Sequence, residues 1–297
     1  MIHVATVHWR SNRWIDPQLH YLDRLMPGPF RVYAFLDRIS GDHHGRFFYT
    51  CRESITDHAK KLDLLGELIF FAAEDPSDPL VFIDGDAFPV APIGPLIEER
   101  LERHRLIAVQ RLENNGALQP HPCFCITTVG FWQDLRSDWH RGAEWLDSEG
   151  VAVTDVGGNL LAALEEADVD WYPLRRMNTV DAHRLFFGLY GDAEHGALIY
   201  HHGSGFRTSA GGRVSRMEGG ERRLQRTVRF RAARVVQKVG PLRDVGRRMD
   251  PVRNLRDGLR AETRRLGDEV FAELQRDDEF WRRFLPADMG QDRGCRR

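Results

Sequence analysis

The chain has 297 residues, 42% of them hydrophobic, and its formal net charge of −2 hides an acidic body and a basic tail. Residues 1–210 carry 19 Lys and Arg against 30 Asp and Glu, whereas residues 211–297 carry 23 against 14. No run of about 18 apolar residues is present, which excludes a transmembrane helix, and four cysteines at this length do not suggest a disulfide framework.

Apolar periodicity predicts alternating strands and helices over the first 90 residues. We expect strands at 2–8, 30–36 and 80–83, and helices at 17–26 and 55–73. This β-α-β-α-β order predicts an α/β fold with a mostly parallel central sheet flanked by helices. In such sheets, ligands bind at the carboxyl ends of the strands.

The remaining chain adds weaker elements to this pattern. Beyond about residue 215 it reads as Arg-rich helices, broken near Gly240-Pro241 and Pro251. We therefore predict a catalytic α/β domain over residues 1–210 and a helical C-terminal appendage over 211–297. The other predictions are a loop at 39–53, strands at 106–110, 124–128, 169–174 and 197–201, and helices at 131–146 and from 155 onward.

The most informative motif is Asp84-Gly85-Asp86, which directly follows the buried strand at 80–83. Two adjacent carboxylates repel each other unless a cation lies between them, and oxygen ligands suit Mn²⁺ or Mg²⁺. Glycine lets the backbone turn tightly there. The motif therefore predicts a metal site, with Asp86 as the first ligand and Asp84 as a second ligand or a ribose contact.

Polar residues at the ends of the first two strands are candidates for contacts to a nucleotide. Thr6 and His8 lie at the end of the first strand and Asp37 follows the second, so all three are expected at the same sheet edge as the Asp-Gly-Asp motif, where Thr6 and His8 would bind through nearby backbone groups. Asp37 suits a base or ribose hydroxyl. A helix cap is the simplest role for Asp155. A functional alternative makes Asp155 the base for an acceptor hydroxyl, assisted by Asn159.

The chain resembles the GT-A fold glycosyltransferases of the DxD type in two segments. One is the strand at 80–83 with the Asp-Gly-Asp and Ala87-Phe88-Pro89 that follow it, and the other is the upstream helix that contains Lys60-Lys61-Leu62. The stretch at 200–207, Tyr-His-His-Gly-Ser-Gly-Phe-Arg, is similar to the late His-x-x-Gly element of that family. The resemblance spans about residues 1–210.

The resemblance implies a role for each matching residue. His202 fits the metal-binding histidine by its spacing to glycine, and His201 precedes it; strand alternation lets only one of them face the metal. Lys61 and Arg207 would flank the diphosphate. The implied activity is the transfer of a hexose from a nucleotide-diphosphate sugar, with UDP as the favoured nucleotide, to an unidentified acceptor.

Two other functions stay open. A phosphatase of the haloacid dehalogenase type also places Asp-x-Asp after an apolar strand, with Asp84 as the nucleophile. Phe88 and the late position of the motif count against it. A non-catalytic nucleotide-sugar-binding protein is the second alternative.

The basic tail and the first residues bear on partners and location. The N-terminal residues lack the pattern of a signal peptide, so we expect a cytoplasmic protein. Packing onto the acidic body is the favoured role of the tail. Contact with an anionic membrane surface is second, and homo-oligomerisation is a further option. No nucleic-acid-binding module is recognisable, so no nucleic acid partner is expected.

Overall fold

The chain forms two units. The first contains Met1–Gly203 together with Asp278–Arg297, and the second contains Ser204–Asp277. The predicted domain boundary between residues 210 and 211 falls outside the described part of the chain. Part of the predicted helical region, from residue 278 onward, belongs to the first unit. The computed structural model describes residues 1–114, 116–146, 150–178, 187–203 and 220–286.

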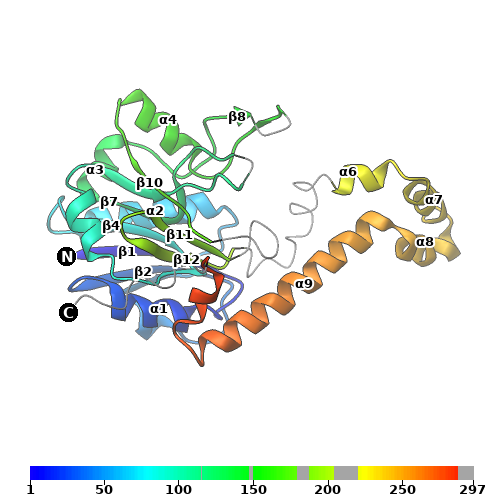
Figure 1. Ribbon diagram of the computed structural model, residues 1–297, viewed down its shortest axis with the longest axis horizontal. Coiled ribbons are helices and arrows are strands. Elements are labelled where there is room, and N and C mark those ends of the chain that lie inside the picture. Colours follow the sequence, from blue (N-terminus) through cyan, green and yellow to red (C-terminus); the bar gives the residue numbers. More distant parts are fainter. Residues whose placement is uncertain (115, 147–149, 179–186, 204–219, 287–297) are drawn as a thin grey trace. The chain divides into compact units, whose positions relative to one another are not determined.

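A twisted sheet forms the centre of the first unit (Figure 1). Within the described residues it has ten strands, in the order β3-β2-β1-β4-β7-β6-β10-β11-β12-β5. A two-stranded sheet, β8 with β9, lies apart from it. The strands are β1 (Ile2–Trp9), β2 (Phe30–Asp37), β3 (Tyr49–Cys51), β4 (Pro79–Asp84), β5 (Ala87–Pro89), β6 (Leu106–Val109), β7 (His121–Thr128), β8 (Trp145–Leu146), β9 (Ala152–Val153), β10 (Tyr172–Arg176), β11 (Gly188–Asp192) and β12 (Gly196–His201).

Strand directions confirm the predicted α/β class. From β3 to β10, the described strands all run the same way except β7, which is antiparallel to both of its neighbours. Beyond β10 the pairing becomes antiparallel through β11, β12 and β5. The sequence analysis missed β3, β5 and β11, since a three-residue strand has too few residues to show a period and β11 contains two glycines.

Helices cover both faces of the sheet. The helix α1 packs on one face, and α2, α3 and α4 pack on the other. Side chains alternate along each strand, so the two faces have separate apolar cores. In the first unit the helices are α1 (Ile15–Leu25), α2 (His58–Ala72), α3 (Val129–Leu135) and α4 (Gly158–Glu166), with short turns η1 (His44–Arg46), η2 (Leu96–Arg100) and η4 (Phe280–Phe284).

The predicted helix over 131–146 is wrong from residue 136 onward. The helix α3 ends at Leu135, because Arg136 takes a left-handed conformation with φ of 50°. Trp139 is nevertheless fully buried, where its ring lies 5.2 Å from that of Phe82 and 5.5 Å from that of Trp132. Of the three tryptophans that produced the helical spacing, Trp132 lies on α3, Trp139 fills the core from a loop and Trp145 lies on β8.

The second unit is helical, as its Arg-rich sequence predicts. Asp250 caps the long helix α9 by accepting backbone hydrogen bonds from Val252 and Arg253, and Arg256 pairs with Glu221 of α6. Within the described residues, no helix is both long enough and apolar enough to cross a membrane. The elements of this unit are α6 (Gly220–Gln225), α7 (Val228–Val236), η3 (Gly240–Leu242), α8 (Arg243–Met249) and α9 (Pro251–Leu274).

Candidate metal and ligand site

Two carboxylates follow the central strand β4, separated by one glycine. Asp84 is the last residue of β4, and Asp86 precedes β5, which pairs with β12 next to His201. A Cβ atom built on Gly85 would lie 2.4 Å from the carbonyl oxygen of Val7 on β1. Because no side chain fits there without movement, glycine lets the turn hold both carboxylates against the carboxyl edge of the sheet.

The structure brings Asp84, Asp86 and His201 together, and we call these three residues the carboxylate–imidazole group. The His201 Nε2 atom lies 3.4 Å from Asp86 Oδ1 and 3.5 Å from Asp84 Oδ2. One ligand atom from each residue lies within 4.8 Å of the other two. Carboxylate oxygens with one imidazole nitrogen form a donor set that suits Mn²⁺ or Mg²⁺.

Asp86 gives the strongest indication of a cation. Its side chain is 1% exposed, and neither carboxylate oxygen has a hydrogen-bond partner among the described residues. Burial raises the pKa of Asp86, but the nearby His201 imidazole outweighs burial and lowers that pKa below its ordinary value. A buried, ionised carboxylate without hydrogen-bond donors is costly unless a cation balances it. The residues present therefore fit a divalent ion.

His58, the first residue of α2, orients the Asp84 carboxylate. The side chain of Asp84 points to the α2 face of the sheet, the same face as Leu80 and Phe82, which lie four and two residues earlier. The His58 Nε2 atom lies 3.0 Å from Asp84 Oδ1. Burial raises the pKa of Asp84, but the hydrogen bond and positive potential of His58, with that of His201, lower it overall. The sequence analysis did not single out His58.

Gln18 of α1 holds the Asp-Gly-Asp turn from the other face. Its Nε2 atom donates to the carbonyl oxygens of Asp84 and Ala87, both at 2.8 Å. Its Oε1 atom accepts from the Thr6 hydroxyl at 3.0 Å and from His8 Nε2 at 3.1 Å. The side chains of Thr6 and His8 are therefore buried and bind Gln18, and the predicted nucleotide contacts through the backbone near these residues stay a prediction. Sequence reasoning missed Gln18; its signal was an amide at the apolar spacing of an amphipathic helix.

Of the two predicted histidines, His201 has the metal-binding geometry. His202 instead lies in an aromatic cluster, where its Nδ1 atom is 3.0 Å from the Tyr200 hydroxyl and its ring is 4.5 Å from that of Trp14. Burial lowers the pKa of His202 to about 4. Its backbone N–H donates to the Asp86 carbonyl oxygen at 2.9 Å, so His202 fixes the turn through its main chain.

Two predicted ligand-binding residues are paired with each other. The Lys61 Nζ atom donates to Asp37 Oδ2 at 2.6 Å, and the two side chains are 2% and 1% exposed. Nζ also lies 5.6 Å from the ring centroids of Trp9 and Phe35. In the described conformation Lys61 and Asp37 therefore form a buried ion pair, and their contacts to a ligand stay a prediction.

A buried arginine near His201 adds positive charge that the sequence analysis missed. The His121 ring lies 6.2 Å from that of His201, and the His121 Nε2 atom lies 3.4 Å from a guanidinium nitrogen of Arg111. Arg111 also lies 3.5 Å from the Glu113 carboxylate. The predicted phosphate-binding Arg207 lies outside the described residues.

The two predicted acceptor-side residues have different partners. Asp155 is buried and its Oδ2 atom accepts from the Asn114 side chain at 2.9 Å. The side chain of Asn159 donates to Asp138 Oδ1, also at 2.9 Å. The prediction that Asp155 caps the following helix is wrong, because the N-cap residue of α4 is Gly157 and the helix has no side-chain capping hydrogen bond.

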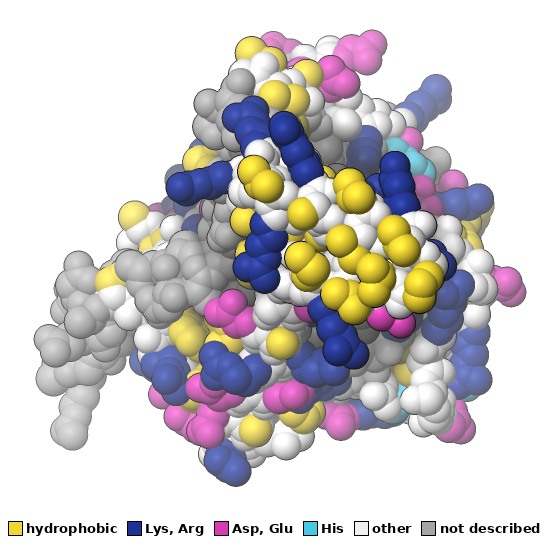
Figure 2. Space-filling view, turned by 90° about the vertical axis from the view of Figure 1, so that its right-hand side faces the viewer, with side chains coloured by type: hydrophobic (Ala, Val, Ile, Leu, Met, Phe, Trp, Pro, Cys, Tyr) yellow, Lys and Arg dark blue, Asp and Glu magenta, His cyan; other side chains and the backbone are white. Residues whose placement is uncertain are grey.

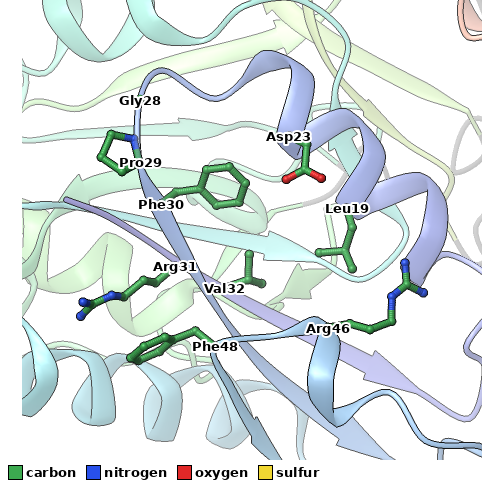
Figure 3. A pocket seen from close by; sticks show the side chains of 9 residues that line it. All are labelled: Leu19, Asp23, Gly28, Pro29, Phe30, Arg31, Val32, Arg46 and Phe48. Carbon is green, nitrogen blue, oxygen red and sulfur yellow. The ribbon is translucent and has the colours of Figure 1, made fainter.

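A hollow of about 600 Å³ lies between α1 and the beginning of β2 (Figure 3). Since β2 begins at Phe30 and ends at Asp37, the hollow lies toward the amino end of that strand, whereas the predicted ligand contacts follow the carboxyl ends. It contains none of the predicted site residues. Its lining residues are Leu19, Asp23, Gly28, Pro29, Phe30, Arg31, Val32, Arg46 and Phe48.

Comparisons with known proteins give distant structural similarities. No protein-family model and no curated protein matches the chain. The crystal structure of the glycosyltransferase GlyE in Streptococcus pneumoniae TIGR4 is 14% identical over 58% of this chain and 45% of that one, with a TM-score of 0.37. S. aureus TarS is 13% identical over 47% and 30%, with a TM-score of 0.35.

A structure of S. aureus TarS 1-349 in complex with UDP-GlcNAc is 14% identical over 47% of this chain and 49% of that one, with a TM-score of 0.32. The matched region thus spans half or less of the length of these neighbours. Similarity at this level does not assign a function, which has to come from the chemistry of the site.

Proposed function

We propose that the protein is a metal-dependent glycosyltransferase that moves a hexose from a nucleotide-diphosphate donor to an acceptor. The observation that carries the proposal is the buried, ionised Asp86 carboxylate, whose oxygens accept no hydrogen bond among the described residues. It lies beside Asp84 and His201 at the edge of the sheet where α/β proteins bind ligands. The resemblance of the sequence to DxD glycosyltransferases favours UDP as the nucleotide.

In this proposal the carboxylate–imidazole group holds Mn²⁺ or Mg²⁺. The bound ion supplies Lewis-acid neutralisation of the charge on a diphosphate leaving group. Residues around the site hold the ligands in position: Gln18 fixes the backbone of the Asp-Gly-Asp turn, and His58 orients the carboxylate of Asp84. Because these contacts exist before a ligand arrives, little reorganisation is needed on binding.

Two further residues complete the proposed chemistry. Arg111 provides a fixed, buried positive charge near His201 that favours an anionic ligand. Asp155 accepts the proton of the acceptor hydroxyl. The Asn114 amide donates a hydrogen bond to the Asp155 carboxylate and holds it in place.

The test compares Asp86→Asn with Asp75→Asn, which makes the same change at an exposed position. Thermal unfolding is followed with Mn²⁺ and a series of UDP-, GDP- and dTDP-sugars, and donor hydrolysis is measured in parallel. For the unchanged protein we expect Mn²⁺ with a UDP-sugar to raise the melting temperature by mass action. Asp86→Asn should abolish that shift and slow hydrolysis by about 100-fold or more, whereas Asp75→Asn should change neither.

The same preparations separate the alternative functions. A phosphatase that uses Asp84 as nucleophile would hydrolyse p-nitrophenyl phosphate and leave nucleotide sugars intact. A non-catalytic binding protein would show the melting shift without any turnover. Either result overturns the proposed activity, and an Asp86→Asn protein with a full Mn²⁺ response overturns the proposed site.

A further inference from the structure

The second unit exposes a set of apolar side chains on α7, η3 and α8, which we call the α7–α8 face. Val228 is 81% exposed and Val235 is 66% exposed, which is unusual for valines in a helix. Figure 2 shows hydrophobic side chains gathered in one area with Lys and Arg around it. The α7–α8 face consists of Val228, Val235, Val239, Leu242, Val245 and Met249.

The packing of α7 on α8 explains why these side chains point outward. The two helices meet at Gly246, where an added Cβ atom would lie 2.6 Å from the backbone nitrogen of Gln237 and 2.9 Å from the carbonyl oxygen of Ala233. The Gln237 amide donates to the Gly246 carbonyl at 3.2 Å and to Asp250 Oδ2 at 3.3 Å. Small and polar residues thus form the contact between the helices, and the larger aliphatic side chains remain at the surface.

Positive charge accompanies the apolar surface. Residues 228–249 contain seven Lys and Arg and one acidic residue, Asp244. Arg234 and Arg243 are exposed on the same two helices that carry the valines. A partner that matches both features must be apolar and anionic at once, which describes the interface of a bilayer containing acidic phospholipids. Nucleic acid fits less well, because the exposed apolar side chains are aliphatic and offer no stacking surface.

We propose that the α7–α8 face binds peripherally to anionic phospholipid bilayers. The aliphatic side chains enter the boundary between headgroups and acyl chains, and the arginines bind lipid phosphates while their stems remain in apolar surroundings. This proposal is independent of the chemistry at the carboxylate–imidazole group.

The test uses the full chain and flotation with phosphatidylcholine vesicles, prepared with and without one quarter phosphatidylserine. We expect phosphatidylserine to strengthen binding by about tenfold or more, and salt at about 1 M to remove most of that gain. The double variant Val235→Asp with Leu242→Asp should lose binding to both kinds of vesicle by about tenfold or more. Circular dichroism checks that the variant remains helical.

If the aspartates introduced at Val235 and Leu242 disturb folding, two double variants that remove positive charge still test the proposal. Arg234→Gln with Arg243→Gln should weaken binding to phosphatidylserine vesicles by about tenfold or more. Arg264→Gln with Arg265→Gln makes the same change in net charge on α9 and should alter binding by less than about twofold. Equal losses of vesicle binding in the two double variants would overturn the proposal, since the net charge of the protein would then explain binding.

Two other outcomes also overturn it. A dimer by light scattering after size exclusion, converted to a monomer by Val235→Asp with Leu242→Asp and found without vesicle binding, would make the face an interface between copies. Binding of single-stranded oligonucleotides, again without vesicle binding, assigns the face to nucleic acid.

Discussion

Carboxylates at the carboxyl edge of the sheet differ in the partner that faces them: a buried lysine donates a hydrogen bond to Asp37, whereas the His201 imidazole lies 3.4 Å from Asp86 Oδ1 without a hydrogen bond to it. Lys61 and Asp37 neutralise each other inside the protein, at 2.6 Å. Asp86 is as deeply buried, yet its oxygens accept no hydrogen bond among the described residues. The difference separates residues that stabilise the fold from a residue that is suited to a ligand.

The Lys61–Asp37 pair allows a direct test of its structural role. Lys61→Met removes the buried hydrogen-bonding partner of the Asp37 carboxylate and leaves only the partly exposed Arg38 Nε, 3.7 Å from Oδ1, as a described ion-pair partner, so we expect the free energy of unfolding to fall by about 3 kcal/mol. Asp37→Asn in the Lys61→Met protein should recover most of that loss. Urea unfolding measures both, and Lys60→Met, an exposed neighbour, is the control. Equal stability of Lys61→Met and Lys60→Met would contradict the described pair.

Asp63 makes the stability of the first unit depend on pH. Burial raises the pKa of Asp63 to about 7, although the Trp139 backbone N–H donates to its Oδ1 atom at 2.9 Å. The folded state therefore keeps a proton on Asp63 that the unfolded state releases near pH 4, and the contribution of Asp63 to the free energy of unfolding falls as pH rises from about 4 to about 7. The total fall is on the order of 3 kcal/mol.

Asp63→Asn removes this contribution, because the amide has no proton to release and can still accept from Trp139. Relative to the unchanged protein, the variant should therefore gain stability as pH rises. Urea unfolding of both proteins at a series of pH values between about 4.5 and 7.5 gives this difference. Asp134→Asn, which changes an exposed carboxylate on α3, should show a difference that does not vary with pH. The same result for Asp63→Asn would contradict the raised pKa of Asp63.

At the scale of elements, the long periodic segments were predicted from sequence and the short ones were not. The strands β1, β2 and β4 and the helices α1 and α2 lie within a few residues of their predicted positions. The pairing of β5 with β12 could not be predicted, because it joins residues more than 100 positions apart through a strand of only three. That pairing brings His201 to the two carboxylates, whereas the His-x-x-Gly spacing in the sequence favoured His202.

The Asp-Gly-Asp turn also depends on an approach that only the structure shows. Gly85→Ala would place a methyl group 2.4 Å from the Val7 carbonyl oxygen and 2.7 Å from His8 Nδ1, so the turn or β1 must move. We expect a loss of about 3 kcal/mol in the free energy of unfolding and a loss of the Mn²⁺-dependent melting shift. Gly45→Ala, where no atom lies within 4 Å, is the matched control. If the two variants behave alike, the close approach is absent in solution.

At the scale of the whole molecule, the first unit is built from two separate stretches of chain. Residues 278–284 return to it after the second unit: the Tyr21 hydroxyl donates to the Asp278 carbonyl oxygen, and Phe284 stacks on Phe187 with ring centroids 5.2 Å apart. Charge and composition marked the Arg-rich region as distinct, but they could not show that its last part belongs to the first unit. Only tertiary contacts carry that information.

The removal of one buried aromatic ring tests whether residues 278–284 belong to the first unit. Phe280 is 8% exposed, so Phe280→Ala should lower the free energy of unfolding of the first unit by about 3 kcal/mol. Phe71→Ala removes the same ring from a position that is 84% exposed and should change little. Tryptophan fluorescence reports on the first unit alone, since all seven tryptophans lie there: Trp9, Trp14, Trp132, Trp139, Trp145, Trp171 and Trp281. An unchanged urea midpoint in Phe280→Ala would contradict the assignment of this segment.

The return of residues 278–284 has a consequence for biosynthesis. A ribosome makes the whole Arg-rich unit before it reaches the segment that packs on α1 and Phe187. The nascent first unit must therefore wait, with part of its apolar surface uncovered, while the inserted helices emerge. Chaperone binding to this intermediate, or its cleavage by proteases, should be strongest in that interval and should cease once Phe284 has left the exit tunnel.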